Sequence, residues 1–326
     1  MSKITVLGTG GWGIALAISA HNAGHDVFMW SAFQSEIDLL TQKRQNEKLL
    51  PGVIIPDEIV FSGDISVAEN SDITIIAVPS VAVGTVAQQL KGVKSHGIVV
   101  NVAKGFDPKT NRRLSQTISD VLPSDCIVVL SGPSHAEEVA RFIPTTLVAA
   151  SNSLVGAEIV QNALSTEFLR IYTSDDVIGV ELGGALKNVV AICAGICDGL
   201  GLGDNTKAAL ITRGLSEMMR LGVCMGANER TFYGLAGVGD LIVTCMSRHS
   251  RNNRFGKLVG SGVPVKEALD DVGTVEGYYA ADIINKLSKK YGLSLAIMEG
   301  CYMILYQNLD VSGVVKDLML RPRHKE

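Results

Sequence analysis

The sequence carries no excess of positive charge, and this excludes one class of partner. Its 326 residues hold 29 Lys and Arg against 33 Asp and Glu, a formal net charge of −4. Nucleic-acid-binding domains usually show an excess or a cluster of basic residues. The one basic cluster, from Arg321 to Lys325, lies at the end of the chain, where charged residues are usually solvated. We therefore expect no nucleic-acid partner.

Disulfide and metal-binding patterns are also missing. The cysteines are scattered and form no C-x-x-C pair, which favours a reduced, cytoplasmic setting over a disulfide framework. The histidines show no ligand spacing and no Ser or Cys partner that would suggest a catalytic triad, so we expect no metal. The residues concerned are Cys126, Cys193, Cys197, Cys224, Cys245 and Cys301, and His21, His25, His96, His135, His249 and His324.

Long apolar runs are absent too. The stretch 189–197 falls well short of the roughly 20 residues that cross a bilayer, and Lys187 and Asn188 interrupt it upstream. A first strand that begins at Ile4 leaves no room for a signal peptide. The sequence therefore predicts a cytoplasmic protein without membrane insertion.

What the first half does contain is an alternation of short β-branched runs with helical stretches. Such an alternation predicts right-handed βαβ units in an α/β fold, here a Rossmann-type, doubly wound and mostly parallel sheet. Ligands bind beyond the carboxyl ends of such strands, where residues 78–80, 102–105 and 131–134 fall. The predicted strands are 4–7, 25–30, 72–78, 98–102, 127–130 and 145–149, and the predicted helices are 14–23, 35–45, 82–90 and 111–121.

The second half shows helical periodicity and no clear strand. A chain of this length usually exceeds a single core. We therefore predict a dinucleotide-binding Rossmann domain over residues 1–174 and an all-α helical substrate and catalytic domain over residues 175–326. The predicted helices of the second domain are 178–197, 207–225, 265–272, 278–291 and 295–306.

A glycine-rich motif follows the first predicted strand and opens the first predicted helix. Gly8 permits a tight turn, Gly10 lets backbone N–H groups approach a pyrophosphate, and Gly13 allows close packing of helix on strand. The alternative is a glycine-rich turn that binds nothing. The position directly after a strand favours a dinucleotide site.

Two lysines are candidates for proton chemistry. Lys187 lies in a helix that is otherwise apolar or small, with no carboxylate three or four residues away, so burial would lower its pKa and suit it to acid–base catalysis. We expect the glycines one turn before it to leave space for a ligand. The alternative is a lysine that extends to solvent at a domain edge. Lys104 ends a predicted strand, so its side chain would point into the crevice beyond the carboxyl ends of the strands. The alternative is an ordinary loop lysine in water.

Three further segments suggest polar sites. Ser250 is a good helix N-cap with Arg251 beside it, a pattern that fits a phosphate site and equally a solvated basic turn. Asp240 ends a flexible glycine turn, where it could orient a lysine or a substrate hydroxyl, or cap the next segment. Ser134 is a plausible N-cap for a helix whose first turn holds Glu137 and Glu138.

Seven short motifs follow one another along almost the whole chain. They are Gly-Thr-Gly-Gly-Trp-Gly (8–13), Ala-Lys-Gly (103–105), Ser-Gly-Pro-Ser (131–134), Glu-Leu-Gly-Gly-Ala-Leu-Lys-Asn (181–188), Gly-Val-Gly-Asp-Leu (237–241), Ser-Arg-Asn (250–252) and Val-Glu-Gly (275–277). In this order they resemble the bacterial NAD(P)-dependent sn-glycerol-3-phosphate dehydrogenase family. The resemblance implies reversible reduction of dihydroxyacetone phosphate to sn-glycerol 3-phosphate by NADH or NADPH, for phospholipid synthesis.

The resemblance also implies roles for single residues. Lys187 matches the general acid/base that protonates the ketone oxygen, Lys104 matches a substrate-orienting catalytic lysine, and Arg251 would bind the phosphate. The implied substrate-binding residues are Lys104, Gly132, Ser134, Lys187, Asp240, Ser250, Arg251 and Asn252. The implied cofactor-binding residues are Gly8, Gly10, Gly11, Trp12, Gly13, Lys104, Ala136, Arg251 and Glu276.

The choice between NAD and NADP stays open at this stage. Where the family commonly has an Arg or His that suits the 2′-phosphate of NADP, Trp30 is followed here by Ser31, Ala32 and Phe33. No Asp or Glu sits there either, so the usual selector for the ribose hydroxyl of NAD is missing as well. We expect relaxed use of both cofactors.

Two rival functions remain. A related dehydrogenase with a Rossmann and a helical domain could act on a small keto or hydroxy acid. The second rival is a module that senses a nucleotide without turnover. The two candidate catalytic lysines, Lys104 and Lys187, argue against it. Apolar helices in the second domain suggest a homodimer. The resemblance implies a small phosphorylated substrate as its partner.

Overall fold

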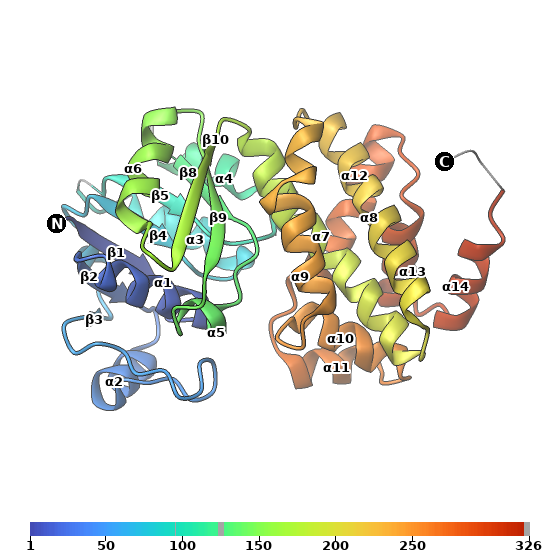
Figure 1. The fold of residues 1–326 in the computed structure, drawn as a ribbon, viewed down its shortest axis with the longest axis horizontal. Coiled ribbons are helices and arrows are strands. Elements are labelled where there is room, and N and C mark those ends of the chain that lie inside the picture. Colours follow the sequence, from blue (N-terminus) through green and yellow to red (C-terminus); the bar gives the residue numbers. More distant parts are fainter. Residues whose placement is uncertain (95, 123–126, 323–326) are drawn as a thin grey trace. The chain divides into compact units, whose positions relative to one another are not determined.

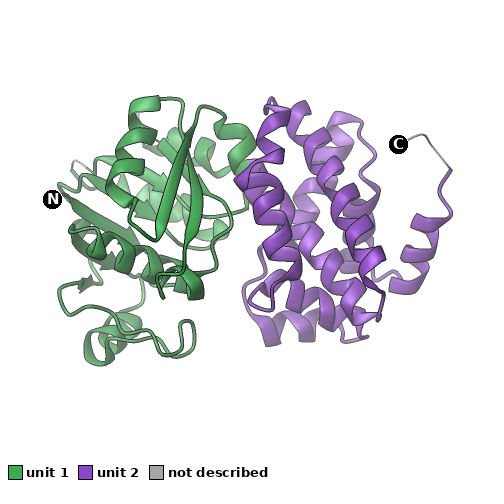
Figure 2. Cartoon of the chain, in the orientation of Figure 1, with its two compact units in different colours: residues 1–181 green, residues 182–326 purple. Residues whose placement is uncertain are grey.

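The computed structural model describes residues 1–94, 96–122 and 127–322 (Figure 1). Cys126 and the last residues of the basic tail, 323–326, lie outside this range. The chain divides into two compact units, residues 1–181 and 182–326 (Figure 2). The sequence places the domain boundary at residue 174, which is the last residue of strand β10; the units divide farther on, within helix α7 (Val177–Gly199).

The first unit is built on an eight-stranded sheet in the order β10-β9-β8-β5-β4-β1-β2-β3. All neighbouring strands are parallel except β8 and β9, which are antiparallel. The strand order reverses at β1, which pairs with β2 on one side and β4 on the other, so the predicted doubly wound, mostly parallel sheet is confirmed. The strands are β1 (Lys3–Leu7), β2 (Asp26–Trp30), β3 (Val60–Ser62), β4 (Ile73–Ile76), β5 (Ile98–Asn101), β8 (Ile127–Ser131), β9 (Thr145–Ala150) and β10 (Leu169–Ser174).

Helices cover both faces of this sheet. Successive strand residues point to opposite faces, so Ile75 packs in the cluster that contains α1 and α6, whereas Ile76 packs in the cluster that contains α3 and α4. This two-sided burial explains the continuous apolar strands. The helices are α1 (Gly11–Asn22), α2 (Gln34–Lys43), η1 (Ile65–Ala68), α3 (Ser80–Leu90), α4 (Leu114–Val121), α5 (Ala136–Val139) and α6 (Leu154–Leu164); β6 (Phe106–Asp107) and β7 (Arg112–Arg113) form a separate hairpin.

The described part of the second unit, residues 182–322, contains helices and no strand, as predicted. Besides α7 it holds α8 (Asp204–Cys224), η2 (Glu229–Tyr233), the π-helix η3 (Leu235–Gly239), α9 (Asp240–Met246), α10 (Arg251–Gly260), α11 (Val265–Val272), α12 (Glu276–Tyr291), α13 (Ala296–Gln307) and α14 (Val311–Met319). The sequence did not predict α9 and α14, which are short, nor β3, β10 and α6 in the first unit.

The expectation that every apolar stretch is short is wrong for helix α7. Lys187 and Asn188 lie inside the helix and do not interrupt it, so α7 is long and apolar enough to cross a membrane by length and composition. However, 94% of its apolar stretch is buried within the structure, as in the core helix of a folded protein.

Backbone contacts hold α10 close against α7. A Cβ atom on Gly195 of α7 would lie 2.0 Å from the carbonyl oxygen of Asn253, and one on Gly256 of α10 would lie 2.0 Å from that of Ile192. Both distances are far inside van der Waals contact, so only glycine fits at either position. The same close packing recurs one turn later, at Gly199 and Gly260.

A buried carboxylate joins α8 to α13. The Glu217 side chain of α8 accepts the backbone N–H groups of Ile297 (2.9 Å) and Met298 (3.1 Å), which begin α13. Helix N-termini carry unsatisfied N–H groups and favour negative charge. Burial nevertheless raises the pKa of Glu217 above its usual range, since Glu217 is only 4% exposed.

The pH dependence of stability should reveal this raised pKa. A carboxyl group whose pKa is higher in the folded than in the unfolded state stabilises the fold fully below about pH 4.5, and this contribution is lost as pH rises through the folded pKa. We expect the free energy of unfolding of the wild type, relative to Glu217→Gln, to fall as pH rises above about 4.5. Urea denaturation across this range measures it. The exposed Glu267→Gln variant is the control, and equal pH slopes for the two variants would contradict the prediction.

Candidate active site

The glycine turn after β1 fits a dinucleotide. Gly8 has φ +126°, and a Cβ atom there would lie 2.5 Å from the carbonyl oxygen of Ala77. A Cβ atom on Gly13 would lie 2.3 Å from the carbonyl oxygen of Gly8, so α1 packs directly on the turn. The space beside Gly10 is open, and Gly10 caps α1 without a side-chain hydrogen bond or an acidic residue in the first turn. The N–H groups of this helix end can therefore receive a pyrophosphate.

Other predicted cofactor residues gather at the same helix end. The position of a Cβ atom on Gly11 lies 3.7 Å from the Cβ of Ala136, the first residue of α5. The indole N–H of Trp12 is buried, and no described residue accepts a hydrogen bond from it. A buried donor of this kind normally has a partner, so it is available to a bound cofactor.

Lys104 joins the ends of two neighbouring strands, β5 and β8. Its ammonium donates to the carbonyl oxygen of Gly132 at 2.8 Å and to the hydroxyl of Ser134 at 3.2 Å. It is therefore not an ordinary loop lysine in water, and three predicted substrate residues meet here. The prediction that Ser134 caps α5 is wrong: the N-cap is His135, and the Ser134 hydroxyl donates to Gly132 O. Glu137 and Glu138 do lie in the first turn of α5, as predicted.

In the second unit, Lys187 is buried in an ion pair. Its Nζ atom lies 2.6 Å from Asp240 Oδ1 and 2.6 Å from the hydroxyl of Thr244, and the lysine is 5% exposed. The expectation that Lys187 lacks a partner is therefore wrong, and so is the alternative in which it extends to solvent. On its own helix no carboxylate lies three or four residues away, but α9 supplies one. Asp240 is in turn 1% exposed.

The backbone of η3 brings that carboxylate to α7. A Cβ atom on Gly183 would lie 2.3 Å from the carbonyl oxygen of Ala236. The space beside Gly183 is therefore filled by η3, which corrects the expectation that it is left for a ligand. Residues 237–240 also do not form the predicted flexible turn: the π-helix η3 continues directly into α9, which begins at Asp240.

Two residues of this group escaped the sequence interpretation. Thr244 follows Asp240 by four residues, a spacing that places both on one face of α9 and that could have identified it. Its hydroxyl also donates to Asp240 O at 2.6 Å. Asn188, next to Lys187, accepts a hydrogen bond from the Asn252 side chain at 3.0 Å.

The start of α10 is capped as predicted. The Ser250 side chain accepts the N–H of Asn253 at 3.2 Å. Asn252 accepts the backbone N–H of Gly277 at 2.9 Å, which links the start of α10 to the start of α12, where Glu276 lies. Arg251 is exposed, and no carboxylate in the described chain forms an ion pair with it. This end of α10 suits an anion.

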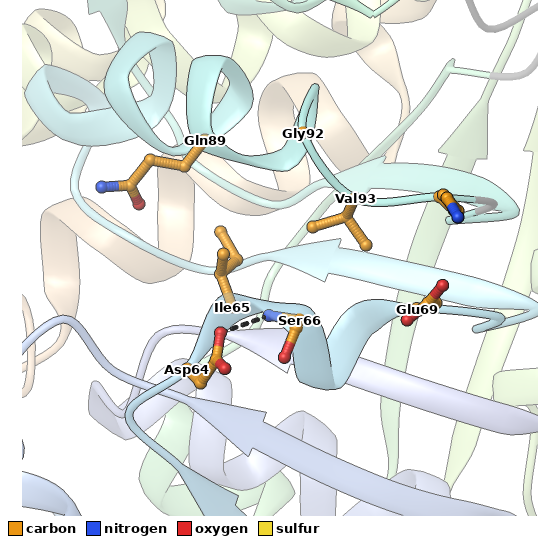
Figure 3. A pocket seen from close by; sticks show the side chains of 8 residues that line it. Asp64, Ile65, Ser66, Glu69, Gln89, Gly92 and Val93 are labelled. Atoms are coloured by element: carbon orange, nitrogen blue, oxygen red, sulfur yellow. Dashed lines mark hydrogen bonds between the residues drawn. The ribbon is translucent and has the colours of Figure 1, made fainter.

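One hollow, of about 410 Å³, lies elsewhere on the first unit (Figure 3). It is bordered by η1 and the end of α3, and no predicted site residue lines it. Asp64, at its edge, is satisfied by the backbone N–H of Ser66 at 2.9 Å. We do not assign this hollow to the reaction.

A double-mutant cycle should show that Lys187 and Asp240 depend on each other. Removing one partner of a buried ion pair leaves a charge without compensation and costs about 3–5 kcal/mol, whereas apolar replacement of both is often close to neutral. We expect Lys187→Met and Asp240→Leu each to lower the free energy of unfolding by about that amount, and the double variant to lose less than either. Chemical denaturation measures this. Additive losses in the double variant would contradict the interpretation.

Comparison with known proteins covers both units. Residues 3–157 match the family model described as NAD-dependent glycerol-3-phosphate dehydrogenase N-terminus, and residues 176–316 match the corresponding C-terminus model. A protein of Desulfitobacterium hafniense named glycerol-3-phosphate dehydrogenase, NAD(P)+, is 50% identical over 100% of this chain and 93% of its own length. A protein of the same name from Fusobacterium nucleatum is 46% identical over 100% of this chain and 99% of its own length.

Solved structures agree with these matches. A crystal structure of glycerol-3-phosphate dehydrogenase from Coxiella burnetii has a TM-score of 0.94 and 37% identity, and the match covers 98% of this chain and 99% of that one. A D-mandelate dehydrogenase shares the fold at a TM-score of 0.64 with 14% identity, over 98% of this chain and 100% of that one. The resemblance seen in the sequence motifs is thereby confirmed: the chain belongs to the NAD-dependent glycerol-3-phosphate dehydrogenase family.

Proposed function

We propose that this protein interconverts dihydroxyacetone phosphate and sn-glycerol 3-phosphate, with NAD(H) or NADP(H) as the second substrate. The observation that carries the proposal is the buried, hydrogen-bonded Lys187 in a chain that also has the dinucleotide turn. In the reducing direction the ketone, the reduced nicotinamide and one proton give the alcohol and the oxidised nicotinamide. The product is the backbone of phospholipids, and this sets the cellular role that we propose.

Lys187 is the proposed proton donor in reduction. The bound nicotinamide supplies the hydride to the ketone carbon. The ketone oxygen then gains negative charge and takes a proton, and the Lys187 ammonium provides it. Asp240 and Thr244 hold Nζ at a defined position by two bonds of 2.6 Å, and the reverse reaction uses the same amine as the base.

The start of α10 is the proposed phosphate site. Its free N–H groups, its helix dipole and the exposed Arg251 guanidinium all favour a dianion. Ser250 and Asn252 fix the backbone there through their own hydrogen bonds. Binding energy from the phosphate, which does not react, orients the ketone.

Lys104 is the proposed orienting residue. Its bonds to Gly132 and Ser134 hold a positive charge at the carboxyl ends of β5 and β8, where parallel sheets bind ligands. We assign Gly132 and Ser134 to the substrate and Gly11, Trp12, Ala136 and Glu276 to the cofactor. We further propose that the protein works as a cytoplasmic homodimer, in keeping with exposed apolar side chains such as Met319 and Leu320 on the helical unit.

Substrate choice tests this function. A related reductase of small keto acids is the second candidate, because the D-mandelate dehydrogenase shares the fold. The decisive measurement is the loss of reduced-nicotinamide absorbance with dihydroxyacetone phosphate, compared with small 2-keto acids. Turnover of the keto acids alone would overturn the proposal, and cofactor binding without any turnover would indicate a sensing module.

The Lys187→Arg variant should show whether Lys187 acts as a proton donor or only as a positive charge. The guanidinium keeps a positive charge beside Asp240, but it does not release a proton near neutral pH. We expect kcat to fall by roughly two to four orders of magnitude, the usual value of general acid–base catalysis, with NADH affinity retained. Steady-state kinetics and NADH binding measure the two effects. A near-normal kcat would remove Lys187 from proton transfer.

Arg251→Ala should weaken binding of the phosphorylated substrate. A charge-assisted hydrogen bond contributes about 1.5–3 kcal/mol, and the lower end applies because Arg251 is exposed. We expect the KM for dihydroxyacetone phosphate to rise roughly tenfold. Arg254→Ala, an exposed arginine one turn farther along α10, is the matched control. Equal KM values in both variants would exclude Arg251 from the phosphate site.

A further inference from the structure

A carboxylate that the sequence interpretation passed over lies against the glycine turn. Glu36 is in the first turn of α2, and its Oε2 atom accepts hydrogen bonds from two hydroxyls. One is the hydroxyl of Thr9, within the glycine turn, at 2.5 Å, and the other is that of Ser31, directly after β2, at 2.6 Å. The side chain thus reaches back from the helix to the carboxyl end of β2.

That position is where a dinucleotide presents its adenosine ribose. In sheets of this type an acidic residue near the end of the second strand accepts a hydrogen bond from the ribose 2′-hydroxyl. Here Ser31 directly follows the strand, and the carboxylate comes from five residues later. Its second oxygen, Oε1, is bonded by no described residue, and Glu36 is exposed. It can therefore accept a hydrogen bond from a ligand.

The two cations at the far end of α2, Lys43 and Arg44, form no ion pair with Glu36. The residues after Ser31 are Ala32 and Phe33. The Arg44 guanidinium donates to the carbonyl oxygens of Ile59 (2.7 Å) and Pro56 (3.3 Å). It also lies over the ring of Phe61, and its Nε is 3.5 Å from Asp57 Oδ1. Lys43 is at the opposite end of α2, roughly 10 Å along the helix from Glu36.

We propose that Glu36 selects NAD(H) over NADP(H). This rests on the proposed function and departs from the relaxed use expected from residues 31–33. A ribose 2′-hydroxyl can donate to the carboxylate, whereas a 2′-phosphate has no proton to donate and adds negative charge beside it. Thr9 and Ser31 together hold the carboxylate, so it moves away only by breaking two hydrogen bonds.

The test is direct binding of NADH and NADPH, followed by nicotinamide fluorescence, without the second substrate. We expect the wild type to bind NADH at least tenfold more tightly than NADPH. In Glu36→Gln we expect that ratio to fall about tenfold, or about 1.4 kcal/mol. Asp38→Asn is the matched control, because Asp38 is an exposed carboxylate on the same helix that bonds only Gln34 among the described residues (2.9 Å). Its ratio should stay that of the wild type.

Three outcomes would overturn the proposal. Equal affinities of the wild type for NADH and NADPH would show that the protein does not discriminate between them. An unchanged ratio in Glu36→Gln, with both affinities lowered alike, would mean that Glu36 only holds the glycine turn. An equal change in Asp38→Asn would indicate a general charge effect. Oxidation of NADH by dihydroxyacetone phosphate, measured separately, tests the proposed function itself, so failure of the one is distinguished from failure of the other.

Discussion

The helical unit depends on how it accommodates one buried ammonium. A charged group away from water is tolerated only with an opposite charge and hydrogen-bond partners close by. Asp240 and Thr244 supply both to Lys187, and they reach it because the backbone of η3 packs against Gly183, one turn earlier on α7. The ion pair and the glycine contact therefore support each other. A larger residue at position 183 would push away the element that carries the compensating carboxylate.

Both units place polar chemistry where backbone comes close to backbone. In the first unit, Gly8 and Gly13 let strand, turn and helix meet so closely that N–H groups, rather than side chains, face an incoming anion. In the second, close packing of α7 and α10 places the capped start of α10 beside Asn188, the neighbour of Lys187. Neither unit uses a metal-type ligand cluster among its described residues. Positive charge comes from lysine, arginine and helix ends.

Local signals in the sequence were enough to predict the fold class. Glycine spacing after an apolar strand identified the turn at 8–13, and helical periodicity identified α11 at 265–272, since both depend only on near neighbours. The partner of Lys187 was not predictable in this way, because Asp240 is distant in sequence and approaches through a π-helix that no simple periodicity signals. Edge strands β3 and β10 were missed because they are half exposed and lack a buried apolar run. The roles of individual site residues remain predictions.

The glycine-lined seam between α7 and α10 has a consequence for how this unit can vary. Where side chains fill the interface between two helices, the distance between the helices can adjust through a change of rotamer or through substitution of a larger residue by a smaller one. At Gly195 and Gly256 the opposing surfaces are main chain, so the helix separation has no such adjustment. Divergence in ligand preference would then have to come from the residues at the start of α10, while the distance between the two helices stays constant.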